Sequence, residues 1–483
     1  MKMRGADLLA RTLAAAGTRH VFALSGNHVM PIFDAALDAK LSLVHVRHEA
    51  ATVHMADAWG RLTGEAGVAL VTGGPGHANA VGALYTALAA QSPLVLISGH
   101  APLDELGRGA FQEMRQADIA APLCKASWTA QSAATLGADV AKALRIARSG
   151  IPGPVHLSVP NDVLDATAEA EIPRQEEPAA SKCPTHSFHG AKRPLVIAGP
   201  AAMRRPWSAG VPVIGMESPR GVNDPALGKV ADVLKRADAV LLVGKRRDFT
   251  LRFGAAFAPG CAVMEVEGDV EIQGTAEPGW AEQVKAALAW RPPEWRSVQS
   301  RPEGPLHPAE LCREVQKLLN QNSVLVSDGG EFGQWAQACL SAPRRVINGP
   351  AGSIGSALPF AAAAKLAFPD APVVAMLGDG TFGFHLSELD TAVRYGLDFI
   401  TVIGNDACWN AERQIQLRAY GKERAHGLDL LPTRYGAVAA ALGAHGEDVL
   451  KADALAPALQ RAGQSGKPAC VNVMIEGLAA PKY

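Results

Sequence analysis

Cysteine is scarce in this sequence and follows no pattern. The seven cysteines are odd in number, lie scattered along 483 residues and are never spaced as C-x-x-C. Such a distribution favours a reducing compartment and gives neither a disulfide framework nor a zinc site. We therefore expect a cytoplasmic protein.

Long apolar runs and an excess of one charge are also missing. No stretch approaches the roughly 20 apolar residues that cross a bilayer. The chain has 46 Lys and Arg against 47 Asp and Glu, a formal net charge of -1. This balance argues against binding to nucleic acid or to a membrane through bulk charge. Asp7 and Arg11 interrupt the apolar opening stretch, so we expect an amphipathic helix there rather than a secretory signal.

Several common catalytic frames are absent as well. The sequence contains no G-x-S-x-G elbow and no G-x-x-x-x-G-K-[ST] phosphate loop. The stretch HEAATVH begins like the zinc motif H-E-x-x-H, but Thr52 stands where the second histidine is needed. These absences exclude the serine hydrolase, P-loop and zincin patterns.

Short apolar runs do alternate with stretches of helical length, in three segments. This alternation predicts parallel sheets covered by helices on both faces. We predict an α/β protein of three doubly wound parallel-sheet domains, at residues 1–165, 191–290 and 307–483, with proline-rich linkers at 166–192 and 291–305. The runs interpreted as strands are HVFAL, LSLVHV, GVALVT, PLVLIS and GPVHLSVP in the first segment, PLVIAG, VPVIGM, AVLLVG and AVMEVE in the second, and SVLVSD, RVINGP, PVVAML, FITVIG and ACVNVMI in the third.

The stretch GDGTFG follows one of these strands and satisfies G-x-G-x-x-G. That pattern is typical of a Rossmann site for NAD, with Asp406 after the next strand as the ribose-binding acid. However, Asp379 lies inside the turn and would repel a pyrophosphate. Mg²⁺ held by Asp379 and Asp406 would remove the conflict and accept phosphate oxygens. From these residues alone, a metal–diphosphate site, a dinucleotide site and a plain strand–helix turn all remain open.

Two stretches resemble thiamine-diphosphate-dependent enzymes. GDG followed by ND is similar to the thiamine-diphosphate signature, and residues 46–99 resemble the pyrimidine-binding domain of the acetolactate synthase and oxalyl-CoA decarboxylase branch. IGNDACW is most similar to 2-hydroxyacyl-CoA lyases of that branch. The resemblance implies that Asp379 and Asp406 bind Mg²⁺, with the backbone carbonyl of Cys408 as a third ligand. Asp406 departs from the asparagine that is more usual there.

The resemblance also gives Glu49 the defining catalytic role. From the residues alone, Glu49 is a solvated acid in the first turn of a helix, where the helix dipole favours it. The family's glutamate hydrogen-bonds N1′ of the aminopyrimidine, and this allows the thiazolium C2 to lose its proton. We expect the same of Glu49.

Further site residues follow from the matching positions of the family. Each also has an ordinary explanation that the sequence does not exclude, such as core packing for Ile354, a polar loop for His28 and a surface aromatic for Phe111. The expected cofactor-binding residues are Gly330, Glu331, Gly352, Ile354, Gly378, Gly380, Thr381 and Trp409; the expected substrate and catalytic residues are Asn27, Phe111, His28 and Gln112.

The resemblance thus implies an enzyme that uses thiamine diphosphate and Mg²⁺ to cleave or form C–C bonds of a 2-oxo acid. Acyl-CoA chemistry is the near alternative, and an NAD oxidoreductase or a thiamine-binding protein with little catalysis are the distant ones. A homodimer or homotetramer with shared active sites is also implied. We do not expect FAD, because the middle segment is short and Thr250 stands where acetolactate synthases carry an arginine.

Overall fold

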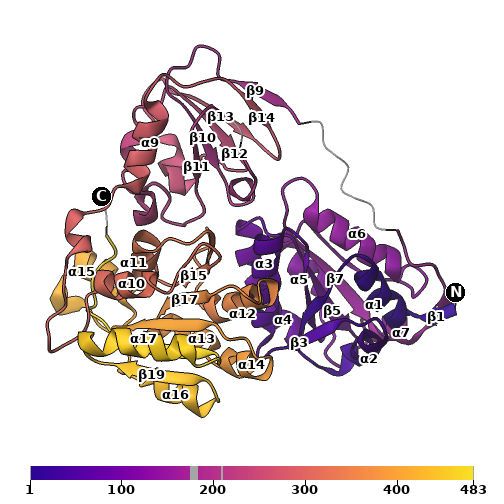
Figure 1. Cartoon of the computed structure of the whole chain (residues 1–483). Coiled ribbons are helices and arrows are strands. Elements are labelled where there is room, and N and C mark those ends of the chain that lie inside the picture. Colours follow the sequence, from indigo (N-terminus) through magenta and orange to yellow (C-terminus); the bar gives the residue numbers. More distant parts are fainter. Residues whose placement is uncertain (1, 175–182, 208–209, 482–483) are drawn as a thin grey trace. The chain divides into compact units, whose positions relative to one another are not determined.

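The computed structural model describes residues 2–174, 183–207 and 210–481 (Figure 1). The chain divides into two compact units, Met1–Lys182 (unit 1) and Cys183–Tyr483 (unit 2). Helices surround parallel sheets in both units. This confirms the predicted α/β class.

Unit 1 is built on a six-stranded parallel sheet in the order β3-β2-β4-β5-β7-β6. The central strands β5 and β7 are buried along their whole length, as strands covered on both faces must be. The strands are β2 (His20–Ala23), β3 (Ser42–His45), β4 (Gly67–Val71), β5 (Leu94–His100), β6 (Ala126–Thr129) and β7 (Pro154–Pro160). The helices are α1 (Gly5–Ala15), α2 (Met30–Asp38), α3 (Glu49–Thr63), α4 (Pro75–Ala89), α5 (Gln116–Ala120), α6 (Leu136–Arg148) and α7 (Asn161–Asp165).

Helix α3 carries Glu49 at its first position and is fixed at both ends. The His48 side chain caps its start by accepting a hydrogen bond from the backbone N–H of Ala50, 3.1 Å away. Gly64, with φ +77°, ends the helix in the left-handed conformation that glycine adopts freely. On its buried face, Arg61 donates to both carboxylate oxygens of Asp57, at 2.7 and 2.5 Å. The helix is therefore tightly packed behind its first two residues, which are half-buried.

The first sheet of unit 2 is small, with four parallel strands in the order β11-β10-β12-β13. Between β10 and β11 the described residues form only a 3-10 helix, η4 (Ala202–Arg204), where a doubly wound domain would place a longer helix. A second hydrophobic core, which includes Phe188 and Val270, packs against the face of the sheet that carries Val196 and Ala198 of β10. The elements here are β9 (Thr185–Ser187), β10 (Pro194–Ala198), β11 (Val213–Gly215), β12 (Ala239–Val243), β13 (Ala262–Val266), β14 (Glu271–Gln273), α8 (Val230–Leu234) and α9 (Trp280–Ala289).

The second sheet of unit 2 has six parallel strands in the order β16-β15-β17-β18-β20-β19. Its strands are β15 (Val324–Asp328), β16 (Arg344–Ile347), β17 (Val373–Gly378), β18 (Ile400–Asn405), β19 (His445–Val449) and β20 (Ala469–Met474). Its helices are α10 (Pro308–Gln316), α11 (Glu331–Cys339), α12 (Ala357–Ala367), α13 (Asp379–His385), α14 (Glu388–Arg394), α15 (Asn410–Tyr420), α16 (Tyr435–Ala441) and α17 (Leu455–Gln464).

The first expected linker, 166–192, is more ordered than its composition predicts. Strand β8 (Thr167–Glu169) pairs antiparallel with β1 (Lys2–Arg4), and β9 pairs with β14. Two short strands, β8 and β9, therefore lie within the segment that was predicted to be a linker. Residues 175–182 of that linker lie outside the described residues.

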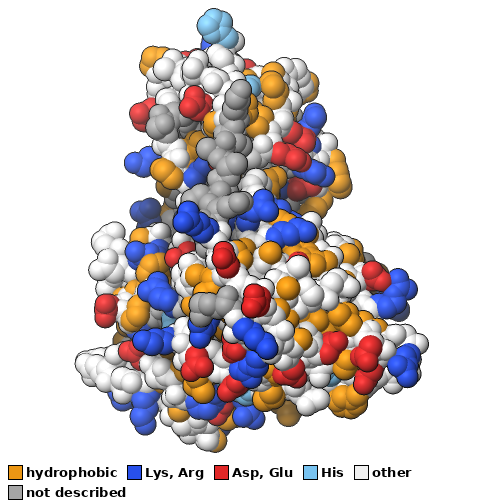
Figure 2. Space-filling model, turned by 90° about the vertical axis from the view of Figure 1, so that its right-hand side faces the viewer, with side chains coloured by type: hydrophobic (Ala, Val, Ile, Leu, Met, Phe, Trp, Pro, Cys, Tyr) orange, Lys and Arg blue, Asp and Glu red, His pale blue; other side chains and the backbone are white. Residues whose placement is uncertain are grey.

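The surface agrees with the balanced charge of the sequence. Lys and Arg side chains are interspersed with Asp and Glu over the face shown in Figure 2. Within the described ranges, no helix is both long and apolar enough to span a bilayer. The seven cysteines all lie in the described part of the chain, and all are free thiols.

Candidate functional site

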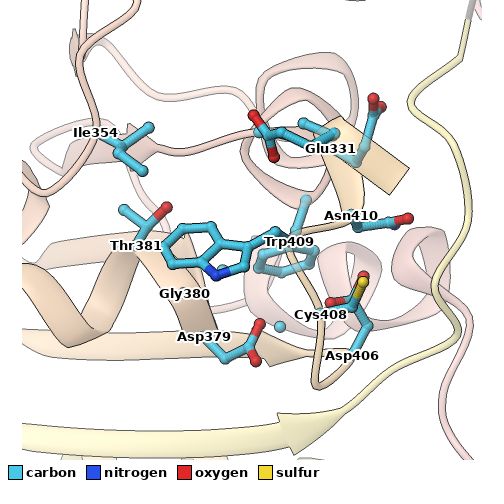
Figure 3. Close-up of a pocket in the computed structure, with 15 residues that line it drawn as sticks. Glu331, Ile354, Asp379, Gly380, Thr381, Asp406, Cys408, Trp409 and Asn410 are labelled. Atoms are coloured by element: carbon cyan, nitrogen blue, oxygen red, sulfur yellow. The ribbon is translucent and has the colours of Figure 1, made fainter. Parts of the chain in front are cut away.

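The carboxyl ends of β17 and β18 form the floor of a pocket in unit 2 (Figure 3). These strands are neighbours, and Gly378 stands opposite Gly404 in their register. Asp379 begins helix α13 directly after β17, and Asp406 follows the last residue of β18. The parallel sheet therefore brings the two carboxylates to one edge, where ligands of such sheets bind.

Most of the residues expected to bind cofactor or metal line this one pocket. Gly352 is not among the residues that line it; Gly352 has φ +68°, and a side chain there would first meet Pro219. The expected residues in the pocket wall are Gly330, Glu331, Ile354, Gly378, Asp379, Gly380, Thr381, Asp406, Cys408 and Trp409; those that sequence reasoning missed are Phe332, Gly404, Asn410, Ala411 and Glu412.

The two carboxylates are costly to keep charged in this pocket. Asp379 is 1% exposed, and its Oδ2 atom has no hydrogen-bond partner. Burial raises the pKa of Asp379 to about 6. Burial, together with the negative charge of Asp379, raises the pKa of Asp406 to about 7. A bound divalent cation would supply the missing partner and remove the repulsion.

The donor set is small but suits Mg²⁺. Among the described residues, no group of three or more His, Cys, Asp or Glu side chains is placed to hold a metal ion. Mg²⁺ typically uses one or two carboxylates and completes its shell with phosphate and water oxygens. Cys408 is buried and its thiol pKa is raised to about 11, so at neutral pH the thiol stays protonated. Any contribution of Cys408 would come from its backbone carbonyl.

The loop after β18 has an unusual backbone. Ala407 has φ +52°, a left-handed conformation that is strained for a residue with a Cβ atom. Its N–H donates to Oδ1 of Asn405 at 3.0 Å, and its carbonyl accepts from the N–H of Leu430 at 2.7 Å. These bonds turn the chain so that Asp406 and Cys408 both face the pocket (Figure 3).

Trp409, in the loop after β18, leaves room only for glycine at position 380. A Cβ atom there would lie 2.7 Å from the Trp409 ring. The indole therefore packs directly on the backbone of the glycine turn, as Figure 3 shows. Trp409 thus forms part of the wall and covers the turn that follows β17.

Glu331 is held by contacts from two distant segments. Its carboxylate forms an ion pair with Arg220 at 3.3 Å and also accepts a hydrogen bond from the backbone N–H of Ala480. Glu331 is 6% exposed and lines the pocket. The side chain therefore ties the pocket wall to the segment after β11 and to the segment after β20.

Asp328, which sequence reasoning missed, organises the opposite wall. It is fully buried at the end of β15, and its Oδ2 accepts from the N–H groups of Gly355 and Ala357, at 3.0 and 2.9 Å. The Ser356 hydroxyl donates to the same oxygen at 3.1 Å. Asp328 thereby caps α12 and fixes the loop that carries Ile354. Its position at the end of an apolar strand was the available signal.

Unit 1 contains Glu49 and a residue that orients it. Glu49 is half-buried, and the side-chain amide of Asn79 donates to its Oε2 at 3.0 Å. Asn79 lies on α4, whose start at the Gly73–Gly74 turn is held by Gln116; the Gln116 side chain accepts from the N–H of Gly74 at 2.8 Å. Sequence reasoning missed both Asn79 and Gln116, because their partners are distant in the chain.

The expected substrate-side residues of unit 1 gather near the same turn. His28 is buried, its ring lies 6.1 Å from that of Phe111 in a stacked arrangement, and its Nδ1 is 3.3 Å from the Thr72 hydroxyl. Burial lowers the pKa of His28 below its ordinary value. Gln112 has φ +58° and packs on Gly74. Asn27 is exposed in the 3-10 helix η1 (Asn27–Val29), and Phe111 is 69% exposed.

Two family matches coincide with these two groups of residues. Residues 3–119 match "Thiamine pyrophosphate enzyme, N-terminal TPP binding domain", and residues 328–473 match the corresponding C-terminal TPP binding domain. A "Probable acetolactate synthase" of Mycobacterium bovis is 33% identical over 98% of this chain and 96% of its own length. The chain belongs to the thiamine pyrophosphate enzymes.

Other members of this enzyme family are similar over the whole chain. The "2-hydroxyacyl-CoA lyase 2" proteins of Danio rerio and Homo sapiens are each 30% identical over 98% of this chain, and over 91% and 90% of their own lengths. This thiamine pyrophosphate enzyme therefore lies in the acetolactate synthase and 2-hydroxyacyl-CoA lyase group. Its glycine turn belongs to a TPP-binding domain, so the interpretation as an NAD site is not retained.

Proposed function

We propose that the protein is a Mg²⁺-dependent C–C lyase or ligase that acts on a 2-oxo acid with thiamine diphosphate. The observation that carries the proposal is the pair of carboxylates formed by buried Asp379, with an unpartnered oxygen, and half-buried Asp406, beside a glycine turn inside the C-terminal TPP-binding match. The 33% identity to the acetolactate synthase favours a 2-oxo acid as substrate.

The residues of the pocket fit the proposed ligands. Asp379, Asp406 and the carbonyl of Cys408 would hold Mg²⁺, and Gly378, Gly380 and Thr381 would leave room for the diphosphate. Gly352 and Ile354 would contact the pyrimidine and fix the bent shape of the cofactor. Glu331 and Trp409 would complete the wall. Thiamine diphosphate, when bound, supplies an electron sink for the carbanion left by cleavage of a bond beside a carbonyl.

The proton-transfer roles are proposed for residues of unit 1. Glu49 would hold and move a proton at N1′ of the pyrimidine, and Asn79 keeps its carboxylate oriented through the 3.0 Å hydrogen bond. His28, kept neutral by burial, would exchange a proton with the substrate. Gln112 and Asn27 would orient the substrate's polar groups, and Phe111 would cover its apolar part.

Acyl-CoA cleavage is the second candidate. It is favoured by the relatives named 2-hydroxyacyl-CoA lyase 2, which match 98% of this chain. For either activity we propose a cytoplasmic homodimer or homotetramer with active sites shared between subunits. We expect no FAD, because only a short 3-10 helix stands between β10 and β11 in the described residues.

The decisive assay is release of carbon dioxide from pyruvate, with and without added thiamine diphosphate and Mg²⁺. We expect cofactor-dependent release, and we expect Glu49→Gln to lower turnover at least about 10²-fold while cofactor binding is retained. Unchanged turnover in Glu49→Gln would refute the proton-transfer role. Cofactor binding without any release would favour the acyl-CoA alternative, which cleavage of a 2-hydroxyacyl-CoA would then test.

A further inference from the structure

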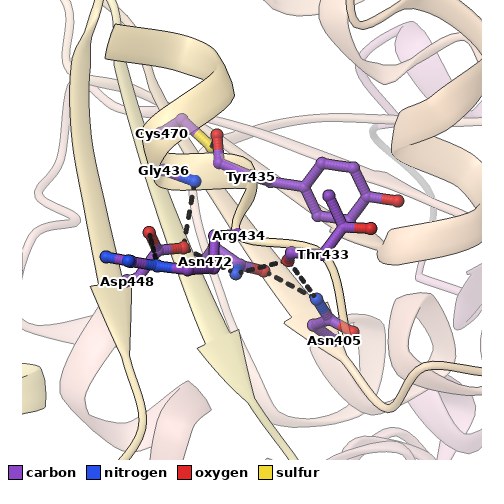
Figure 4. Close-up of polar contacts among 8 residues, drawn as sticks. All are labelled: Asn405, Thr433, Arg434, Tyr435, Gly436, Asp448, Cys470 and Asn472. Atoms are coloured by element: carbon purple, nitrogen blue, oxygen red, sulfur yellow. Dashed lines mark hydrogen bonds and ion pairs between the residues drawn. The ribbon is translucent and has the colours of Figure 1, made fainter. Parts of the chain in front are cut away.

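Three neighbouring strands of the second sheet of unit 2 carry a connected row of polar side chains (Figure 4). Asn405 ends β18, Asn472 lies on β20 and Asp448 lies on β19. The side-chain amide of Asn405 donates to Oδ1 of Asn472 at 3.1 Å. The amide of Asn472 donates in turn to Oδ1 of Asp448 at 2.9 Å. The row begins directly beside Asp406 and leads away from the pocket.

The same two amides hold the segment that crosses the row. Both donate to the backbone carbonyl of Thr433, Asn405 at 3.1 Å and Asn472 at 3.2 Å. Upstream of Thr433, the segment pairs with the loop after β18. The N–H of Trp409 donates to the carbonyl of Leu428 at 2.9 Å, and the N–H of Leu430 donates to the carbonyl of Ala407 at 2.7 Å. The row therefore holds the segment from Leu428 to Thr433 in place, and this segment is in turn hydrogen-bonded to the loop after β18.

Asn405 also acts on the loop directly. Its Oδ1 accepts from the N–H of Ala407 at 3.0 Å, while its amide group makes the bonds to Thr433 and Asn472. The left-handed backbone of Ala407 is strained, and such strain persists only where surrounding contacts impose it. The contacts that impose it here are the side chain of Asn405 and the backbone of Leu430.

The row has the properties of a rigid support. Asn405 and Asn472 are almost fully buried, and each side-chain oxygen and nitrogen has a partner. Buried networks in which every member is satisfied hold one arrangement firmly. Asp448 is anchored at its outer end by the N–H of Gly436 at 3.1 Å and by Arg434 at 3.3 Å.

We propose that Asn472 and Asp448 are positioning residues for the Mg²⁺ site, acting through Asn405 and Ala407 on Asp406 and on the carbonyl of Cys408. The inference rests on the proposed function for the existence of the metal site. It assigns to two residues on β20 and β19, neither of which lines the pocket, a share in setting the metal's affinity.

The test is calorimetric titration of Mg²⁺ into the full-length protein in the presence of excess thiamine diphosphate. Asn472→Leu keeps the size of the side chain and removes its hydrogen bonds. We expect at least about tenfold weaker Mg²⁺ binding, the scale typical of losing a residue that orients a metal ligand. Asp448→Ala, which removes the outer acceptor, should weaken binding in the same direction. If Asn472→Leu does not fold, the result for Asp448→Ala decides the test.

Asp448→Asn is the matched control. Its Oδ1 can still accept from Asn472 and Gly436, so its Mg²⁺ affinity should stay close to that of the wild type. Wild-type affinity in a folded Asn472→Leu or Asp448→Ala variant would overturn the inference. So would an Asp448→Asn variant as weak as Asp448→Ala, because charge rather than hydrogen bonding would then decide the affinity. A wild-type protein that bound no Mg²⁺ would instead overturn the proposed function.

Discussion

Asp406 offers a sharp test of the proposed metal site, because thiamine-diphosphate-dependent enzymes more usually carry asparagine at this position. Asp406→Asn keeps the shape and one ligand oxygen but removes a charge that repels Asp379. The pKa of Asp406 is raised to about 7 and that of Asp379 to about 6. In the proposed site, protons would therefore compete with Mg²⁺ for both carboxylates in the wild type, and for Asp379 alone in the variant.

The expected change of Mg²⁺ affinity with pH follows from these pKa values. Mg²⁺ needs the ionised carboxylate. Its affinity is therefore at its maximum above the raised pKa of the carboxylate and falls as the pH drops through that pKa. Between pH 8 and pH 6, protonation of a group with a pKa of about 7 weakens binding about tenfold, whereas a pKa of about 6 contributes only about twofold. The wild type should lose about 20-fold in affinity over this range, and Asp406→Asn about twofold.

The assay is Mg²⁺ titration at pH 6, 7 and 8 with excess thiamine diphosphate, in the wild type and in Asp406→Asn. Titration of the cofactor's own phosphate affects both proteins equally, so the difference between their slopes isolates Asp406. Parallel pH profiles would refute the argument that Asp406 is a titrating metal ligand. A larger loss of Mg²⁺ affinity in the variant than in the wild type as pH falls would also refute it, because removing Asp406 should weaken the pH dependence.

Two further predictions concern stability. Asp57→Ala should lower the free energy of unfolding by about 3–5 kcal/mol, because it removes the carboxylate that forms a buried ion pair with the guanidinium of Arg61. Urea unfolding measures this, with Asp57→Ala/Arg61→Met as the control that should recover much of the loss; a cost under about 1 kcal/mol would contradict it. Ala407→Val should be less stable than Ala407→Gly by at least about 1 kcal/mol, because only glycine adopts φ +52° freely. Equal unfolding midpoints for these two variants would show that the loop is not strained.

The sequence predicted every central strand of the three larger sheets and missed two of their edge strands. Strands such as β17 and β18 are uninterrupted apolar runs, because both of their faces are buried. Strands β6 (ASWT) and β19 (HGEDV) lie at the edges of their sheets, and most of their residues are only half-buried. An edge strand needs fewer apolar side chains, so no apolar run marked these two.

The sequence also predicted only part of the candidate site. Asp379 and Asp406 could be predicted to meet, because each follows a strand of one parallel sheet. Asn79 and Asp328 could not be assigned their partners. Asn79 contacts a residue 30 positions away, and Asp328 contacts residues 27 to 29 positions away. Those pairings depend on how helices and loops pack, which local sequence patterns do not encode.

The contact between Glu331 and the backbone of Ala480 has a consequence for the order in which the protein is made. The two residues are 149 positions apart, so Glu331 leaves the ribosome long before its partner is synthesised. Unit 1 lies wholly upstream and can fold while the rest of the chain is still emerging. The wall of the pocket in unit 2, by contrast, stays incomplete until residue 480 has been translated. A ligand that needs the complete wall can therefore bind only after Glu331 and Ala480 have both been synthesised.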